Sequence, residues 1–144
     1  MFQMLGTALL AVSSIQEGRA RQEEAEFNRY QLQLKARQTK IEAAQRSNQR
    51  IADFNSAQNN NEAFFAFLGR DSSDRSVKAF MAKQKDIAYK DANQITSQGF
   101  MEASQALMAG KMETVKGQNA LRAGYLGAAS SVVSGIYRYQ QTKV

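Results

Sequence analysis

The side chains able to do chemistry in this 144-residue chain are carboxylates, lysines, arginines and hydroxyls, because it contains no Cys and no His. Without a His base, a Ser or Cys nucleophile of the triad type has no general base. Zinc sites built on sulfur or imidazole ligands are excluded for the same reason. The Asp and Glu residues are scattered and form no loop typical of a calcium site.

An enzyme with a Ser–Lys or carboxylate-pair mechanism would need a concave, preorganised pocket, and this composition is a poor source of one. We therefore predict that the chain is not an enzyme and that it carries no catalytic residues, no cofactor and no metal.

The formal net charge of +6 is unevenly distributed along the chain. Residues 1–15 carry no charged side chain, whereas residues 120–144 carry three basic ones and no acidic one. A basic excess favours anionic partners such as nucleic acid or anionic lipid, although it also serves solubility alone. The basic residues between positions 16 and 50 could follow phosphates, but the chain has no nucleic-acid motif and no aromatic stacking platform. The charge predicts only non-specific contact with DNA.

The absence of Pro and the abundance of Ala, Gln, Glu, Lys, Arg, Met and Leu predict an all-α chain. From Phe27 onward, apolar residues recur with the heptad spacing of a coiled-coil seam. The seam consists of Phe27, Tyr30, Leu34, Ile41, Ala44 and Ile51, with polar breaks at Arg37 and Asn48. Two favourable i,i+4 ion pairs are expected on the same helix, Glu17 with Arg21 and Glu42 with Arg46.

The strongest break in the helical pattern lies between residues 59 and 74. Three Asn residues at 59–61 weaken the helix, and Gly69 is a natural residue just beyond a helix end. Asp71-Ser72-Ser73 offers an N-cap for a second helix, with Asp74 in its first turn. These signals predict one helix over 1–68, a turn over 69–73 that uses Gly69, Ser72 and Ser73, and a second helix over 74–144. The predicted fold is a long antiparallel helical hairpin.

The second predicted helix carries a stripe of residues that recurs about every 3.67 residues, from Val77 through Ala88, Gly99 and Gly117 to Ile136. Gly is frequent in this half, and each Gly costs about 1 kcal/mol relative to Ala inside a helix. The number of glycines in this helix favours close approach by a neighbouring backbone. The alternative is that the glycines are simply points of flexibility. Seams of Ala, Gly and Gln bury little apolar surface. We therefore expect the hairpin to be ordered in a multi-subunit assembly, as a homo-oligomer.

Both ends of the chain are apolar, over residues 1–15 and over a small-residue tail at 121–139. No Lys or Arg precedes the first run, so it is not predicted to be a secretory signal. The hairpin should bring the two ends together, and each is shorter than the roughly 20 residues that a lone spanning helix needs. Arg and Tyr flank the tail as they flank membrane segments, whereas a soluble complex would bury these ends as protein contacts. The candidate membrane or subunit contacts are Phe2, Leu5, Leu9, Leu10, Gly124, Gly127, Val132, Val133 and Ile136.

The stretch from Lys90 to Ile136 resembles the small internal core proteins of short-tailed phages, the family of internal virion protein B. The resemblance is carried by residues 118–135, Gln-Asn-Ala-Leu-Arg-Ala-Gly-Tyr-Leu-Gly-Ala-Ala-Ser-Ser-Val-Val-Ser-Gly. It implies a non-enzymatic virion protein stored in the capsid near the portal, with the portal and other internal core and ejection proteins as partners. It also implies ejection ahead of the genome and a contribution to a channel through the host outer membrane. The apolar ends would then contact outer-membrane lipid, and the protein would move from the virion to the host cell envelope.

Two other functions fit the same residues. One is a purely structural core or adaptor subunit that packs its apolar ends on a portal-like ring and never touches lipid. The other is a packaging protein that binds nucleic acid through its net charge.

Overall fold

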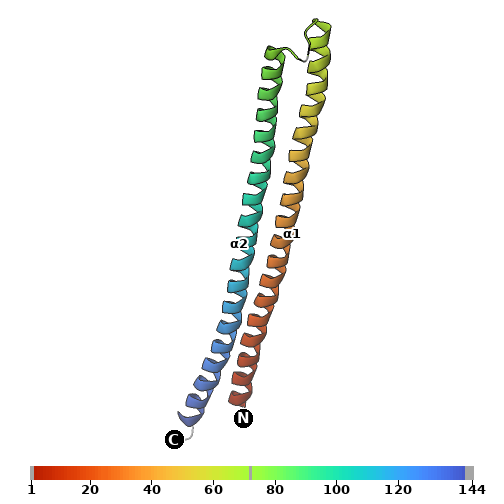
Figure 1. The fold of residues 1–144 in the computed structure, drawn as a ribbon. Coiled ribbons are helices and arrows are strands. Elements are labelled where there is room, and N and C mark those ends of the chain that lie inside the picture. The colour runs from red at the N-terminus through yellow and green to blue at the C-terminus, as the bar shows by residue number, and fades with distance from the viewer. Residues whose placement is uncertain (1, 72, 142–144) are drawn as a thin grey trace. The chain divides into compact units, whose positions relative to one another are not determined.

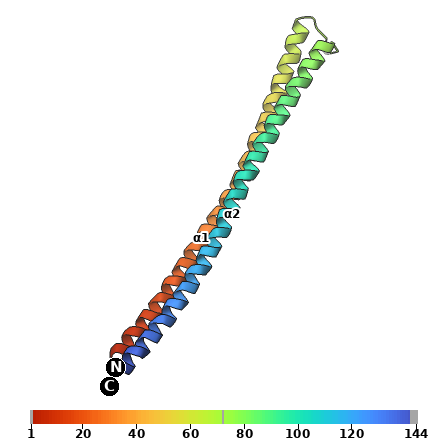
Figure 2. The same ribbon diagram turned by 90° about the vertical axis from the view of Figure 1, so that its left-hand side faces the viewer.

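The structure, a computed structural model, describes residues 2–71 and 73–141, and among these the side chains of residues 9–71 and 73–137. Helix α1 spans Phe2–Phe67 and helix α2 spans Arg75–Gln141. The two helices run antiparallel, lie side by side and are joined by a short turn (Figure 1 and Figure 2). The predicted all-α helical hairpin is thereby confirmed. Helix α1 continues through the three Asn residues at 59–61 and stops six residues later.

The chain forms two compact units. The terminal unit consists of Met1–Leu34 and Ala106–Val144, and the turn unit consists of Lys35–Gln105. Each unit pairs one stretch of α1 with one stretch of α2.

Helix α1 ends in a Schellman motif around Gly69. The Gly69 N–H donates to the Ala66 carbonyl at 3.0 Å, and the Arg70 N–H donates to the Phe65 carbonyl at 3.0 Å. These bonds satisfy carbonyls that the last helical turn would otherwise leave free. The motif requires the left-handed conformation, and Gly69 has a φ of 69°, which glycine adopts without a Cβ clash.

Helix α2 begins with Asp74 as its N-cap. The Asp74 carboxylate accepts hydrogen bonds from the N–H and the hydroxyl of Ser76, both at 3.0 Å. The prediction of an N-cap within residues 71–73 is therefore wrong, because the sequence offers several adjacent capping residues and does not rank them. Ser73 instead donates its N–H and its hydroxyl to the Asp71 carboxylate. Ser72 lies outside the described residues.

Aromatic side chains pack beside the turn. The rings of Phe65 in α1 and Phe80 in α2 meet edge to face with 5.8 Å between centroids, and Phe64 stands at 6.1 Å from Phe65. Phe67 lies outside this cluster and is 86% exposed. An aromatic contact between α1 and α2 therefore packs the turn unit at this end, although the ring of Phe67 stays exposed.

Small residues fill the contact between the two helices. The buried apolar residues that the structure describes are mostly alanines: Ala25, Ala36, Ala43, Phe54, Val77, Ala88, Ala92, Ala103 and Ala128. The stripe predicted on α2 is confirmed from Val77 to Gly117, with Ala88 and Gly99 among its buried members. Beyond this point only its member Ala128 is buried, whereas its members Tyr125, Val132 and Ile136 are exposed.

The heptad seam predicted on α1 does not face α2. Phe27, Tyr30, Leu34 and Ile41 are all exposed. In the terminal unit, Ala25 approaches Gly117 instead, and Phe27 lies two residues further on, about 200° around the helix. A seam of Ala and Gly brings two backbones closer together than Phe or Leu would permit. The large residues are consequently left on the outside.

Candidate functional site

The ends of the two helices meet through their backbones within the terminal unit. A Cβ placed on Gly124 would lie 2.6 Å from the Ser14 carbonyl oxygen and 3.2 Å from the Gly18 Cα. A Cβ on Gly18 would lie 3.0 Å from the Ala120 carbonyl oxygen. The close backbone approach predicted from the glycines is therefore confirmed at this contact, and so is the meeting of the two apolar ends.

The candidate contact residues divide into two groups. Gly124 and Gly127 lie against Ser14 and hold the two helices together. The large apolar side chains instead point outward. The exposed group consists of Leu9, Leu10, Val132, Val133 and Ile136. The side chains of Phe2 and Leu5 lie outside the described residues. Within the described part, the outward group is free to contact a partner and the inward group is not.

Serine hydroxyls in these ends are turned back onto their own helices. Ser13 and Ser14 donate to the Leu10 carbonyl at 2.9 and 3.0 Å. In α2, Ser130 and Ser131 both donate to the Gly127 carbonyl, and Ser134 donates to the Ser130 carbonyl. Each hydroxyl proton is satisfied without a partner molecule. The surface offered to a neighbour is therefore less polar than the sequence indicates.

Over the described residues, neither helix contains a segment long and apolar enough to cross a membrane.

A surface pocket of about 180 Å³ lies beside the glycine contact. Its wall includes Ser14, Glu17, Gly18, Arg21, Gly124 and Gly127. The two charged residues are bonded to each other, with 2.6 Å between Arg21 Nη2 and Glu17 Oε1. Both are well exposed, so the pocket presents a neutralised ion pair and backbone, with no activated nucleophile or base.

Titratable groups elsewhere are perturbed only by local partners. A hydrogen bond from Lys116 lowers the pKa of Glu113, and a hydrogen bond with Asn28 of α1 lowers it by a smaller amount. A hydrogen bond to Asp86 raises the pKa of Lys90. No group of acidic side chains that could hold a metal ion occurs in the part of the chain that the structure describes. These shifts belong to surface ion pairs and indicate no catalytic centre.

Basic residues of α1 are partly engaged with carboxylates. The predicted pairs Glu17–Arg21 and Glu42–Arg46 are both present. In the turn unit, Arg50 reaches across to α2, where its Nε and Nη2 donate to one oxygen of Asp91 at 3.1 and 2.8 Å. Nothing in the sequence marks this last pair, since the two residues are 41 positions apart and pair only once the register of the hairpin is known.

Comparisons with models of protein families, with curated proteins and with solved structures find no match to this chain.

Proposed function

We propose that this chain is a structural subunit of a multi-subunit helical assembly. The proposal is carried by the contrast between a seam of small residues and an outer surface with many large apolar side chains. Among the described residues no large side chain is fully buried, while Phe27, Leu126 and Met108 are each more than half exposed. Large apolar side chains exposed in such number are typical of a protein or membrane contact.

The sequence resemblance carries the proposal further, to an internal virion protein of a short-tailed phage. In this role the chain is stored near the portal, leaves with the genome and contributes to a channel for DNA across the host outer membrane. The residues that carry the resemblance, 118–135, include Gly124, at which α2 lies directly against the backbone of α1. A chain without Cys has no disulfide to break when it is moved from one assembly to another.

The apolar ends are the surface that we assign to outer-membrane lipid. Their hydroxyls are satisfied internally and their large side chains are exposed, which lowers the free-energy cost of placing them in a bilayer interface. Tyr125 and Tyr137 are also exposed, and Tyr is favoured at such interfaces.

A purely structural role, without membrane insertion, is the second candidate. It is favoured by exposed apolar residues far from the ends, such as Phe27 and Met108, which a membrane contact at the ends would leave uncovered. These residues suit contacts between subunits. In this alternative the ends pack on a portal or on another core protein.

Dye release from vesicles of outer-membrane lipid, combined with sedimentation, tests both roles. The full chain is compared with Val132→Asp/Val133→Asp and with the control Ser130→Asp/Ser134→Asp, which adds the same charge at exposed polar positions of the same helix. Release that is lost only in the valine variant supports the channel. No release by any variant, together with oligomers that only the valine variant disrupts, supports the structural alternative. A full chain that is monomeric throughout contradicts both.

A further inference from the structure

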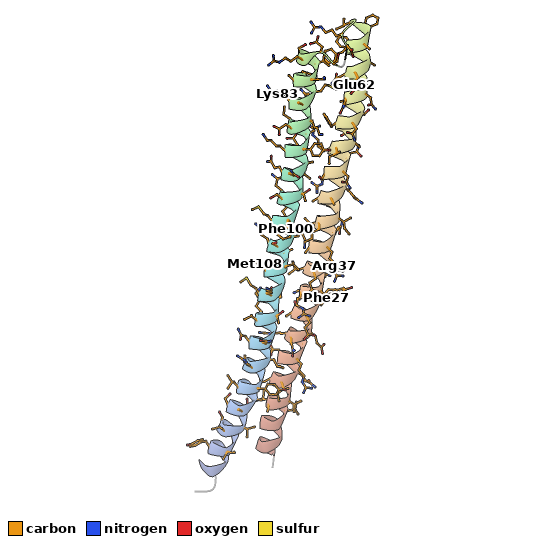
Figure 3. The ribbon with its side chains drawn as sticks, viewed as in Figure 1. Phe27, Arg37, Glu62, Lys83, Phe100 and Met108 are labelled. Atoms are coloured by element: carbon orange, nitrogen blue, oxygen red, sulfur yellow. The ribbon has the colours of Figure 1, made fainter. Side chains whose placement is uncertain are left out.

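In the terminal unit, each helix carries an apolar stripe on the side that faces away from the other helix. The α1 outer stripe is Phe27, Tyr30 and Leu34, and the α2 outer stripe is Met108, Met112 and Val115. All six side chains are exposed, Phe27 by 59% and Met108 by 67%. Figure 3 shows Phe27 and Met108 on opposite outer sides of the two helices.

The contacts between the helices explain why the stripes point in opposite directions. Ala25 of α1 lies against Gly117 of α2, and Leu32 lies against Gly110. Residues two positions apart in an α-helix are separated by about 200° of rotation. Each of the six stripe residues lies two positions from one of these four contact residues. The stripes therefore lie on the two outer edges of the hairpin.

The stripes also lie at the same height along the hairpin. Because the helices are antiparallel, each step forward from Ala25 corresponds to one step backward from Gly117, as the contact of Leu32 with Gly110 shows. Phe27 is thus level with Val115, Tyr30 with Met112 and Leu34 with Met108. One edge of the hairpin matches the opposite edge in length and in apolar spacing.

We propose that a second copy of the chain covers each stripe, so that the α1 outer stripe of one copy packs on the α2 outer stripe of the next. This inference rests on the proposed function in taking the chain to be a subunit of an assembly. The copies stand side by side in one orientation, since α1 meets the neighbouring α2 in the same antiparallel sense as within the hairpin. The interface is heterologous, and it produces a closed ring or an open filament.

Charge complementarity favours a second copy of the chain as the partner that covers each stripe. In the terminal unit, residues 16–34 of α1 carry four acidic and three basic side chains: Glu17, Glu23, Glu24 and Glu26 against Arg19, Arg21 and Arg29. The level residues 108–126 of α2 carry one acidic and three basic side chains, Glu113 against Lys111, Lys116 and Arg122, and Lys116 is bonded to Glu113. A side-by-side arrangement therefore brings a net acidic segment of α1 to a net basic segment of α2. A parallel α1–α1 pairing would instead bring the Glu residues of two copies together.

The seven-residue spacing of both stripes continues along the helices. In the turn unit, Ile41 follows Leu34 by seven positions and Met101 precedes Met108 by seven, and both are exposed. Apolar residues sustained at this spacing are typical of a helix that packs against another helix.

Disulfide trapping tests the arrangement, because the chain has no Cys of its own. Leu34→Cys/Met108→Cys places thiols at level positions on opposite edges, where they cannot pair within one hairpin. Oxidation should therefore give a ladder of dimers, trimers and larger species on denaturing gels. Each single variant alone should give little cross-linking, while a mixture of the two single variants should give dimers only.

The matched control is Leu34→Cys/Val115→Cys, in which the two thiols are offset by seven residues, about 10 Å along the helix axis. A disulfide requires Cα atoms within about 7 Å, so this variant should cross-link several-fold less. Circular dichroism verifies that every variant keeps the helix content of the full chain.

Four results would overturn the proposal. Efficient dimers from a single variant would indicate a symmetric interface between identical edges. Equal ladders from the level and offset variants would show that no register exists. Absence of cross-links in a chain that sediments as an oligomer would exclude this interface and leave the proposed structural role intact, whereas a monomeric chain would overturn both.

Discussion

Gly124 and Ser14 are in backbone contact, with the Ser14 carbonyl oxygen only 2.6 Å from the point where a Cβ would stand on Gly124. Such an approach excludes every side chain at position 124 unless the helices move apart. Gly127, one turn further along, has only ordinary contacts at 3.6 Å with the Ser14 side chain. Two glycines in one segment therefore have different structural roles.

The first prediction concerns this difference. Gly124→Ala should lower the free energy of unfolding by about 1–3 kcal/mol, because the new methyl group overpacks a backbone contact. Gly127→Ala should raise it by about 0.5–1 kcal/mol, because it removes a flexible residue from a helix without a clash. Urea unfolding followed by circular dichroism measures both. Equal stability of the two variants would contradict the backbone contact.

A second prediction concerns the Schellman motif. Gly69→Ala should destabilise the hairpin by about 1–2 kcal/mol, because the positive φ of 69° strains a residue with a Cβ. Gly69→Asn is the control, since Asn adopts the left-handed conformation more readily and should lose less. Thermal unfolding measures the stability of both variants. If Gly69→Asn destabilised the hairpin as much as Gly69→Ala, that result would contradict the Schellman motif.

A third prediction concerns Arg50 and Asp91, which pair across the two helices in the turn unit. Their side chains are about 36% and 45% exposed, so solvent screens the pair. A double-mutant cycle of Arg50→Ala and Asp91→Ala should give a coupling energy below about 1 kcal/mol. The cycle for Arg46 and Glu42 on one helix is the control and should give about 0.3–0.5 kcal/mol.

Salt provides the diagnostic for this ion pair. In about 1 M salt the Debye length falls to about 3 Å, and the coupling energy should shrink in both cycles. A coupling between Arg50 and Asp91 that salt leaves unchanged would indicate packing of the Arg stem as its source.

The helical hairpin followed from the sequence because its signals are local. The absence of Pro and the abundance of helix-forming residues predict helix locally, and Gly69 predicts a helix end within a few residues of its own position. Together they were enough to predict two helices and the turn between them. The identity of the N-cap was missed because Asp71, Ser72, Ser73 and Asp74 all favour that role. Only the hydrogen bonds of Asp74 to Ser76 decide it.

The contact face of α1 could not be predicted from the largest apolar residues. The heptad of Phe27, Leu34 and Ile41 is the more visible pattern, yet Ala25 and Ala36 are the residues that face α2. The glycines of α2 allow the two helices to approach closely. At this short distance only a small residue such as Ala fits on the face of α1 that meets them. Reading the α1 pattern against the spacing of Gly110 and Gly117 would have identified the face. The cross-helix pair of Arg50 and Asp91 depends on the resulting register and has no signal of its own.

A fourth prediction concerns the pH dependence of the α2 N-cap. Hydrogen bonds from the Ser76 N–H and hydroxyl lower the pKa of Asp74 below its ordinary value of 3.8. The folded chain therefore favours the charged carboxylate more than the unfolded chain does. The resulting stabilisation is complete above the unfolded pKa of 3.8 and is lost as the pH falls through the lower, folded pKa. Asp74→Asn keeps an acceptor for the same N–H but cannot ionise, so it should lack this part of the pH dependence.

Thermal unfolding between about pH 2 and about pH 6 compares the two chains, and NMR titration of the Asp74 carboxyl gives its pKa directly. The difference in Tm between the full chain and Asp74→Asn should narrow as the pH falls below 3.8 and should be flat above it. Ser73, whose hydroxyl bonds to Asp71 and not to Asp74, supplies the control. Ser73→Ala should lower Tm without altering the pKa of Asp74, whereas Ser76→Ala should raise that pKa, because the Ser76 hydroxyl bonds directly to the carboxylate. An Asp74 that titrates at or above 3.8 in the folded chain would mean that its carboxylate does not cap α2.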